Sequence, residues 1–252
     1  MDLGLTERVF LVTGGTRGLG AATAEVLTLE GAKVVVSSRT ATDVEATVAR
    51  LGAQKATGVT ADNSDPTTPA RLIDAALQSY GRLDGALISV GGPPVGGATQ
   101  VTDDDWLRSF HTLFLGAVRI ARSVVDVLEP GGSIAFVLSS SVRSPIPNLA
   151  VSNGLRPGLA MFAKTLAEEV GPRGIRVNGL LPGRHTTGRT TELEAGAPDA
   201  PALRQRLEAG IPLRRYGQPI EFGRVGAFVL SPAASYLTGT MIPVDGGALR
   251  VL

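Results

Sequence analysis

Short runs of β-branched and other apolar residues alternate along this chain with longer stretches that have the apolar spacing of helices. The short runs carry few polar residues, which is typical of strands that are buried on both faces of a parallel sheet. They are Val9–Val12, Val34–Val36, Gly85–Ile88, Ile134–Leu138, Ile175–Val177 and Met241–Val244. The alternation predicts a doubly wound α/β fold of the Rossmann type, with helices on both faces of the sheet.

Between these strands, the predicted helices are Ala21–Leu29, Pro69–Tyr80, Asp103–Leu128, Pro157–Val170 and Ile220–Leu230. The region from Gly183 to about Pro201 is rich in Thr, Gly, Arg and Pro, and we predict that it is irregular. Because long irregular connections in compact domains often cover a site, we interpret residues 183–219 as a lid segment. The length of 252 residues and the 43% hydrophobic content favour a single domain that spans residues 1–252.

The composition argues against several classes of partner. There are 24 basic and 23 acidic side chains and no basic run, so we expect no nucleic-acid partner. The chain has no cysteine and only two histidines, His111 and His185, so we expect no metal site. The first residues contain no apolar targeting core, and no apolar run reaches the ~18 residues that span a bilayer. We therefore expect a cytoplasmic protein without a membrane partner.

A glycine-rich loop, TGGTRGLG at residues 13–20, follows the first predicted strand and leads directly into a helix. Glycines let the backbone approach a pyrophosphate closely, and the free amides at the start of the helix stabilise its negative charge. A glycine cluster alone is a weak signal, but this one lies inside a strand–helix–strand unit, which favours dinucleotide binding. The residues expected to hold the pyrophosphate are Gly14, Thr16, Arg17, Gly18 and Leu19.

The spacing TGxxxGxG resembles that of the short-chain dehydrogenase/reductase family, and the resemblance extends over nearly the whole chain. Further matches are Asp62-Asn63, Arg176-Val177-Asn178 before Pro182-Gly183 and Thr187, Tyr236–Gly239 and Val244–Gly247. The resemblance implies a nicotinamide-dependent oxidoreductase that acts on a carbonyl or alcohol substrate. Among family members, this chain resembles a divergent relative of the 3-oxoacyl-(acyl-carrier protein) reductases.

The resemblance also implies which residues border the cofactor. Asp62, with Asn63 beside it, is expected near the adenine, and Ser89 to Gly91, which include Val90, near the adenosine ribose. Pro182, Gly183 and Thr187 are expected at the nicotinamide end.

The end of the second predicted strand indicates which dinucleotide binds. An acidic residue there would accept a hydrogen bond from a free ribose 2′-hydroxyl and repel a 2′-phosphate. This strand instead ends in Ser37-Ser38-Arg39. Arg39 can bind a phosphate through two hydrogen bonds, Ser38 can donate to it, and Arg17 adds a second cation. We therefore predict NADP(H) in preference to NAD(H).

Family members transfer the proton with a tyrosine and hold the ribose with a lysine four residues later, aided by a serine and often an asparagine. Lys164–Ala167 and Arg176–Asn178 both place the tyrosine position at Ser152 and the lysine position at Arg156. The asparagine position falls on Leu113. Only the serine is retained: Ser139 has the customary separation, and Ser140 or Ser141 is the alternative.

Ser152 and Arg156 cannot replace the missing acid directly. An alkyl hydroxyl is too weak an acid at neutral pH, and arginine stays protonated. Arg156 can still stabilise negative charge on a carbonyl oxygen or hold the ribose, with the proton supplied by water or by a substrate. Tyr216 and His185 are the only substitute acids, and a structural role is favoured for both. The turn-forming pair Asn153-Gly154 and the following Pro157 predict that the helix begins at Pro157, which favours extended backbone at Arg156, although proline is also tolerated in the first turn of a helix.

Two functions therefore stay open from the sequence. The first is an NADP(H)-dependent oxidoreductase with a degenerate catalytic site, in which Ser139, Ser152 and Arg156 are the candidate residues. The second is an NADP(H)-binding protein without turnover, such as a sensor, a scaffold or an inactive partner in an oligomer. The resemblance also implies a homotetramer or homodimer, with interfaces at Asp103–Leu128 and Val244–Leu252.

Overall fold

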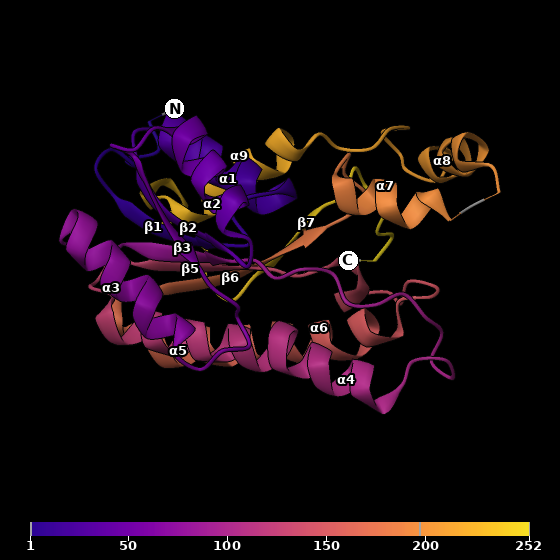
Figure 1. Ribbon diagram of the computed structural model, residues 1–252, viewed down its shortest axis with the longest axis horizontal. Helices are drawn as coiled ribbons and strands as arrows, with labels where there is room; N and C mark the ends of the chain where they lie inside the picture. The colour runs from indigo at the N-terminus through magenta and orange to yellow at the C-terminus, as the bar shows by residue number, and fades with distance from the viewer. Residues whose placement is uncertain (1, 197, 252) are drawn as a thin grey trace.

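The computed structural model describes residues 2–196 and 198–251, so what was predicted for Met1, Ala197 and Leu252 lies outside the described residues. The described strands form one parallel sheet of seven strands in the order β3-β2-β1-β4-β5-β6-β7 (Figure 1). They are β1 Val9–Thr13, β2 Lys33–Ser38, β3 Ala56–Thr60, β4 Gly85–Ile88, β5 Ser133–Val137, β6 Arg176–Pro182 and β7 Met241–Val244. The predicted doubly wound α/β fold is confirmed.

Helices cover both faces of this sheet (Figure 1). One layer contains α1 (Gly18–Leu29), α2 (Ala41–Leu51) and α9 (Pro219–Leu230). The other contains α3 (Thr68–Tyr80), α4 (Asp103–Ser109), α5 (Gly116–Val127) and α6 (Ala150–Val170). A π-helical turn, Phe110–Leu115, joins α4 to α5, so the predicted single helix Asp103–Leu128 is interrupted.

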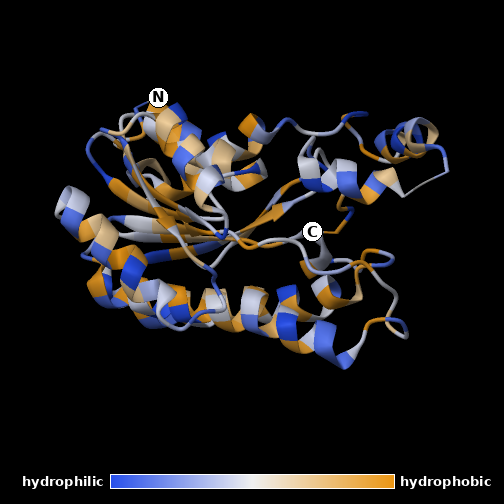
Figure 2. Ribbon diagram, in the orientation of Figure 1, coloured by the Kyte–Doolittle hydropathy of each residue, from blue (hydrophilic) through white to orange (hydrophobic). Residues whose placement is uncertain are grey.

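The strands bury their side chains on both faces, as their near-continuous apolar sequence predicts. All five residues of β1 and of β5 are buried, and so are all four of β4. Apolar side chains of the helices pack against the sheet. Along these helices hydrophobic and hydrophilic residues alternate, as the colours of Figure 2 show. This packing fixes the ends of the strands, from which the functional residues extend.

The region predicted to be irregular between Gly183 and Pro201 is not irregular. It contains α7 (Gly188–Ala195) and the start of α8 (Ala200–Ala209). The side chains of Thr187 and Asp199 each accept a hydrogen bond from an amide in the first turn of the helix that follows. These N-terminal caps are the local signals that the composition of the segment obscures.

The prediction that α6 begins at Pro157 is wrong, because the helix begins seven residues earlier at Ala150. The Asn153 side chain accepts from the Ile146 amide at 3.0 Å and donates to the Ile146 carbonyl at 2.9 Å, which fixes the first turn. Pro157 lies inside the helix, where it removes only one backbone hydrogen bond. Arg156 is therefore helical, not extended.

The strand order reverses between β1 and β4, and ligands of open α/β sheets bind at such a reversal, beyond the carboxyl ends of the strands. The Thr13 hydroxyl donates to the Ser89 carbonyl at 2.7 Å and accepts from the Ser89 amide at 2.9 Å. These two bonds hold the ends of β1 and β4 together and fix the loops that diverge from them.

None of the helices within residues 2–196 and 198–251 combines the length and the apolar character that crossing a bilayer requires.

Candidate active site

The glycine-rich loop forms a tight cradle at the start of α1. Gly14 has φ +58° and Gly18 has φ +56°, a left-handed conformation that glycine adopts readily. A Cβ atom on Gly20 would clash with the Gly14 carbonyl oxygen, so the helix can start this close to the loop only with glycine there. No side chain caps the first turn of α1, which leaves its amides available to an anion. The cradle thus fits the pyrophosphate of a dinucleotide.

A second helix start lies close to this cradle. A Cβ atom on Gly18 would lie 3.7 Å from the Thr187 methyl group, and Thr187 is the N-cap of α7. Thr187 and the glycine loop, which are far apart in the sequence, are therefore brought together. Because the amino-terminal end of a helix carries partial positive charge, two such ends at one place favour binding of a doubly charged pyrophosphate.

The predicted 2′-phosphate site is exposed beside the end of β2. Arg39 is exposed and has no carboxylate within 4.0 Å among the described residues. Arg17 lies with its Nε 3.8 Å from an Asp43 carboxylate oxygen, and Ser38 donates to the Thr40 carbonyl at 3.4 Å. Sequence reasoning missed Asp43, which lies in the first turn of α2 and offsets part of the positive charge of Arg17.

The remaining predicted cofactor residues lie in loops that follow the strands. The Asp62 carboxylate accepts from the amide and the hydroxyl of Ser64 at 2.9 and 2.8 Å, which shapes the turn after β3. The Asn63 backbone packs so closely against Gly116 that a Cβ there would clash with the Asn63 carbonyl. Val90 is half-buried and Gly91 is exposed after β4. Pro182 is the last residue of β6, Gly183 follows it, and both are half-buried.

Arg156 is buried, with 7% of its surface exposed. Its guanidinium donates one hydrogen bond, from Nη1 to the Val137 carbonyl at 2.6 Å, at the carboxyl end of β5. Burial lowers the pKa of Arg156 from 12.5 to about 10, so the group is still protonated at neutral pH. The residue predicted to lie at the family's lysine position is thus a buried cation, and one hydrogen bond of its guanidinium is described.

The Ser152 hydroxyl pairs with that of Ser141 at 3.2 Å, and both side chains are buried. Ser139 has a different contact: its hydroxyl accepts from the Ser141 amide at 3.0 Å and so caps the 3₁₀ turn Ser140–Val142. Of the three serines considered from the sequence, Ser141 is the one whose hydroxyl lies against the tyrosine position.

The asparagine position is apolar in the structure. Leu113 is 4% exposed and lies in the π-helical turn, a feature that often marks functional segments of helices. It supplies no polar group to the site.

The two substitute acids considered from the sequence are already engaged. The Tyr216 hydroxyl donates to the Glu194 carboxylate at 2.7 Å, and burial, followed by this hydrogen bond, raises the pKa of Tyr216 to about 12. His185 packs edge-on against Phe222 and is 4% exposed. Burial also lowers the pKa of His185, which keeps its ring neutral at pH 7. These contacts support the structural role that the sequence favoured.

Sequence reasoning missed Arg189, in the first turn of α7. Its Nη2 donates to the Pro93 carbonyl at 2.7 Å, and a Cβ on Gly92 would lie 2.7 Å from its Nε. Arg189 therefore fastens α7 to the loop that follows β4. No composition signal distinguishes this arginine from the others in the segment.

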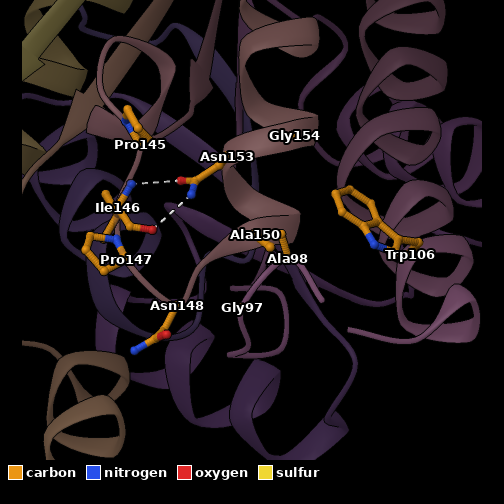
Figure 3. Close-up of a pocket in the computed structure, with 10 residues that line it drawn as sticks. All are labelled: Gly97, Ala98, Trp106, Pro145, Ile146, Pro147, Asn148, Ala150, Asn153 and Gly154. Atoms are coloured by element: carbon orange, nitrogen blue, oxygen red, sulfur yellow. Dashed lines mark hydrogen bonds between the residues drawn. The ribbon is translucent and has the colours of Figure 1, made fainter. Parts of the chain in front are cut away.

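A cavity of about 540 Å³ lies on the other side of the first turn of α6 (Figure 3). Asn153 and Gly154 line it together with Trp106, and a Cβ on Gly154 would lie 2.7 Å from the indole ring. The 3.6-residue period of α6 places Asn153 and Gly154 on a different face of the helix from Ser152 and Arg156. The cavity is therefore separate from the buried serine and arginine side chains.

The fold and the glycine cradle define a dinucleotide-binding α/β protein, and comparison with known proteins identifies its family. The family profile described as enoyl-(acyl carrier protein) reductase matches residues 14–248. An uncharacterised oxidoreductase of Methylorubrum extorquens is 36% identical over 96% of this chain and 98% of its own length. The chain belongs to the short-chain dehydrogenase/reductase family, as the sequence motifs predicted, and its fold is one that binds a nicotinamide cofactor.

Two solved structures extend the comparison. L-sorbose reductase from Gluconobacter frateurii, complexed with NADPH and L-sorbose, matches with a TM-score of 0.93 and 28% identity over the full length of both chains. A short-chain oxidoreductase from Pseudomonas aeruginosa PAO1, described as containing an atypical catalytic center, matches with a TM-score of 0.91 and 27% identity, again over both full lengths.

Proposed function

We propose that this protein is an NADP(H)-dependent carbonyl oxidoreductase that works without the tyrosine and lysine of its family. The observation that carries the proposal is the buried Arg156 beside the end of β5, on the same helix as Ser152, whose hydroxyl pairs with that of Ser141 in the preceding 3₁₀ turn. The relative from Pseudomonas aeruginosa, described as having an atypical catalytic center, supports the view that this fold accommodates other catalytic groups.

A nicotinamide cofactor held by the glycine loop at residues 13–20 would supply the hydride, with its electron pair, for the carbonyl carbon. Ser152 and Ser141 donate hydrogen bonds to the carbonyl oxygen, and Arg156 stabilises the negative charge that develops there. Burial strengthens this stabilisation, because little water competes for the guanidinium. Water delivers the proton that completes the alcohol, since a serine hydroxyl is too weak an acid and Arg156 has to keep its proton to stabilise the negative charge.

Consumption of NADPH, measured with a panel of aldehydes, ketones, quinones and acyl thioesters, tests the proposed reaction. Turnover of at least one class is the expected result. Tight NADPH binding without any turnover would favour the non-catalytic alternative, a sensor, a scaffold or an inactive oligomer partner. The double variant Ser152→Tyr with Arg156→Lys separates the two further: it should raise carbonyl reduction if only the proton donor is missing.

The choice of NADP(H) is supported by the exposed, unpaired Arg39 at the end of β2 and by the NADPH in the L-sorbose reductase structure. Arg39→Ala should raise the Kd of NADPH by roughly 10- to 150-fold, since a charge-assisted hydrogen bond contributes about 1.5–3 kcal/mol, and should leave the Kd of NADH nearly unchanged. Arg50→Ala is the matched control, because Arg50 lies in the last turn of α2 and pairs with Glu25 of α1 at 3.0 Å. Tighter binding of NADH than of NADPH by the unmodified protein would refute this choice.

We further propose that residues 183–219 act as a lid over the cofactor, fastened by the Arg189–Pro93 hydrogen bond. Arg189→Ala should then raise the dissociation rate of NADPH, measured by stopped-flow fluorescence. The control variant Arg206→Ala, in the last turn of α8, should leave that rate unchanged. Equal rates in the two variants would contradict the lid.

The homo-oligomer implied by the family also stays a proposal. Leu107, Phe110 and Met161 are exposed apolar residues on the neighbouring elements α4, the π-helical turn and α6, with 59%, 39% and 64% of their surfaces accessible. A second copy of the chain would cover them. Light scattering should show a dimer or tetramer that Phe110→Glu with Met161→Glu dissociates. A monomeric unmodified protein would refute it. The cytoplasmic location remains a prediction of the sequence.

A further inference from the structure

Two arginines and one carboxylate lie around the end of β2, where we propose that the 2′-phosphate of NADP(H) binds. Arg39 follows the strand directly, and Arg17 is the N-cap residue of α1. Asp43 lies in the first turn of α2. A phosphate is bound by cations, so the carboxylate is the group at this place that recognition of a phosphate does not explain.

Asp43 acts on one of the two arginines. Its Oδ2 atom lies 3.8 Å from the Nε atom of Arg17, and the two side chains are 36% and 77% exposed. This separation is too long for a hydrogen bond, so the attraction is electrostatic, and a ligand can bind Arg17 without displacing a hydrogen bond to Asp43. Arg39, by contrast, has no carboxylate within 4.0 Å in the ranges 2–196 and 198–251.

The two dinucleotides should respond differently to this carboxylate. The 2′-phosphate of NADPH is repelled by Asp43, and the positive charge that Arg17 offers to it is already partly offset. The neutral 2′-hydroxyl of NADH experiences neither effect. Because a pair of exposed charges contributes little free energy, Asp43 should weaken NADPH binding by a small factor rather than prevent it.

We propose that Asp43 is a specificity-determining residue that acts through Arg17 and narrows the preference for NADPH, so that the protein accepts both dinucleotides. This inference rests on the proposed cofactor. Arg17 exchanges Asp43 for the 2′-phosphate when NADPH binds and keeps Asp43 when NADH binds. A carboxylate in the first turn also stabilises a helix, but that role depends neither on Arg17 nor on which dinucleotide is present.

Fluorescence titration of the full chain with NADPH and with NADH tests the proposal without turnover. In about 0.1 M salt, Asp43→Asn should lower the Kd of NADPH by roughly 2- to 5-fold and leave the Kd of NADH nearly unchanged. In about 1 M salt, which screens charges over ~3 Å, the gain should disappear. Asp43→Ser, a second neutral variant, should give the same gain. Glu45→Gln is the matched control, because Glu45 is an exposed carboxylate on the same helix, and it should change neither Kd.

A double-variant comparison tests the route through Arg17. In an Arg17→Ala background, Asp43→Asn should lose most of its effect on the Kd of NADPH, since the two substitutions remove the same interaction. A gain of the same size in that background would overturn the inference, because Asp43 would then act on the phosphate directly. Equal gains for NADPH and NADH, or equal gains in Asp43→Asn and Glu45→Gln, would overturn it too. The Kd of NADH also reports folding, because a misfolded variant binds neither dinucleotide.

The outcome is distinguishable from that of the proposed function. Absence of turnover with every carbonyl would remove the oxidoreductase function and leave the role of Asp43 standing. Tighter binding of NADH than of NADPH by the unmodified protein would remove the choice of cofactor, whereas a shift toward NADPH in Asp43→Asn would still support Asp43 as a specificity-determining residue. An unchanged ratio of the two Kd values in Asp43→Asn would remove that role and leave the proposed function intact.

Discussion

Arg156 and Arg176 are both buried against the sheet, each with 7% of its surface exposed. Arg156 lies where the parallel strands end, and Arg176 lies where they begin. Arg176, at the amino end of β6, donates to four carbonyl oxygens, those of Val229, Leu230, Ser231 and Leu237. Three of these belong to the carboxyl-terminal end of α9, where the helix carries partial negative charge. Arg156, at the carboxyl end of β5, donates to one carbonyl.

The difference is the one expected between a structural cation and the functional cation that we propose. Four of the five N–H donors of Arg176 are used by the fold, so this arginine holds α9 to β6 and has little left for a ligand. The spare donors of Arg156 contribute nothing to the fold, and they lie where open α/β sheets bind their ligands. Burial of an arginine therefore says little by itself; the number of acceptors that the chain provides indicates which role it has.

Replacement of Arg176 gives the largest expected effect. Arg176→Met leaves several buried carbonyls at the end of α9 without donors, and we expect a loss of about 4 kcal/mol in the free energy of unfolding. Urea denaturation measures it. The matched control is Arg173→Met, because Arg173 also donates to helix-end carbonyls, those of Val125 and Leu128, but is exposed. Its loss should be about 1 kcal/mol. Equal losses would break the comparison.

Replacement of Arg156 should have the reverse profile. Arg156→Met removes an unpaired buried charge, so the free energy of unfolding should change by less than about 1 kcal/mol or increase. Carbonyl reduction should fall by roughly 100-fold, as when a donor to a developing oxyanion is removed. Urea denaturation and steady-state kinetics on the same preparation measure both effects. A stability loss as large as that of Arg176→Met, with activity retained, would make Arg156 structural as well.

The pH dependence of the rate sharpens this assignment. The pKa of Arg156 is lowered to about 10, and the protonated form is the one that stabilises negative charge, so reduction should persist up to pH 10 and decline above it. In Arg156→Lys, burial lowers a pKa that starts near 10.4 rather than 12.5, and the decline should move down by at least one pH unit. Rates measured from pH 6 to 11 test this. An unchanged profile would mean that another group controls the decline.

Much of the fold could be predicted because its signals are local. The apolar strands and the glycine loop each carry their pattern in adjacent residues, and these predictions agree with the structure. No range was predicted for β3, whose side chains are partly exposed and include Thr57 and Gly58, nor was α2 predicted, because only Val44 and Thr47 of that helix are buried. β3 is an edge strand of the sheet, and α2 packs against β2 and β3. Fewer side chains are buried at this edge, so the apolar pattern of the sequence is weaker there.

The candidate site was less predictable because its geometry depends on contacts between distant residues. Asn153 and Gly154 suggest a turn in isolation, yet the loop at Ile146 and the Trp106 ring hold them in a helix. The family spacing selects Ser139, whereas the 3₁₀ turn after β5 directs the Ser141 hydroxyl toward Ser152. The family spacing counts residues along the chain, so it does not show in which direction the 3₁₀ turn points each serine hydroxyl.

The serines give the smallest expected effect. If Arg156 supplies most of the stabilisation, Ser152→Ala and Ser141→Ala should each lower the reduction rate by about 3- to 10-fold, the value of one neutral hydrogen bond of about 1 kcal/mol. Ser139→Ala should instead lower the free energy of unfolding by about 1 kcal/mol, because it removes the cap of the 3₁₀ turn, and should change the rate less than Ser141→Ala does. Kinetics and urea denaturation of the three variants side by side decide between them. A Ser139→Ala rate far below that of Ser141→Ala would return the catalytic serine to the position that the family spacing selects, and would mean that the turn opens when substrate binds.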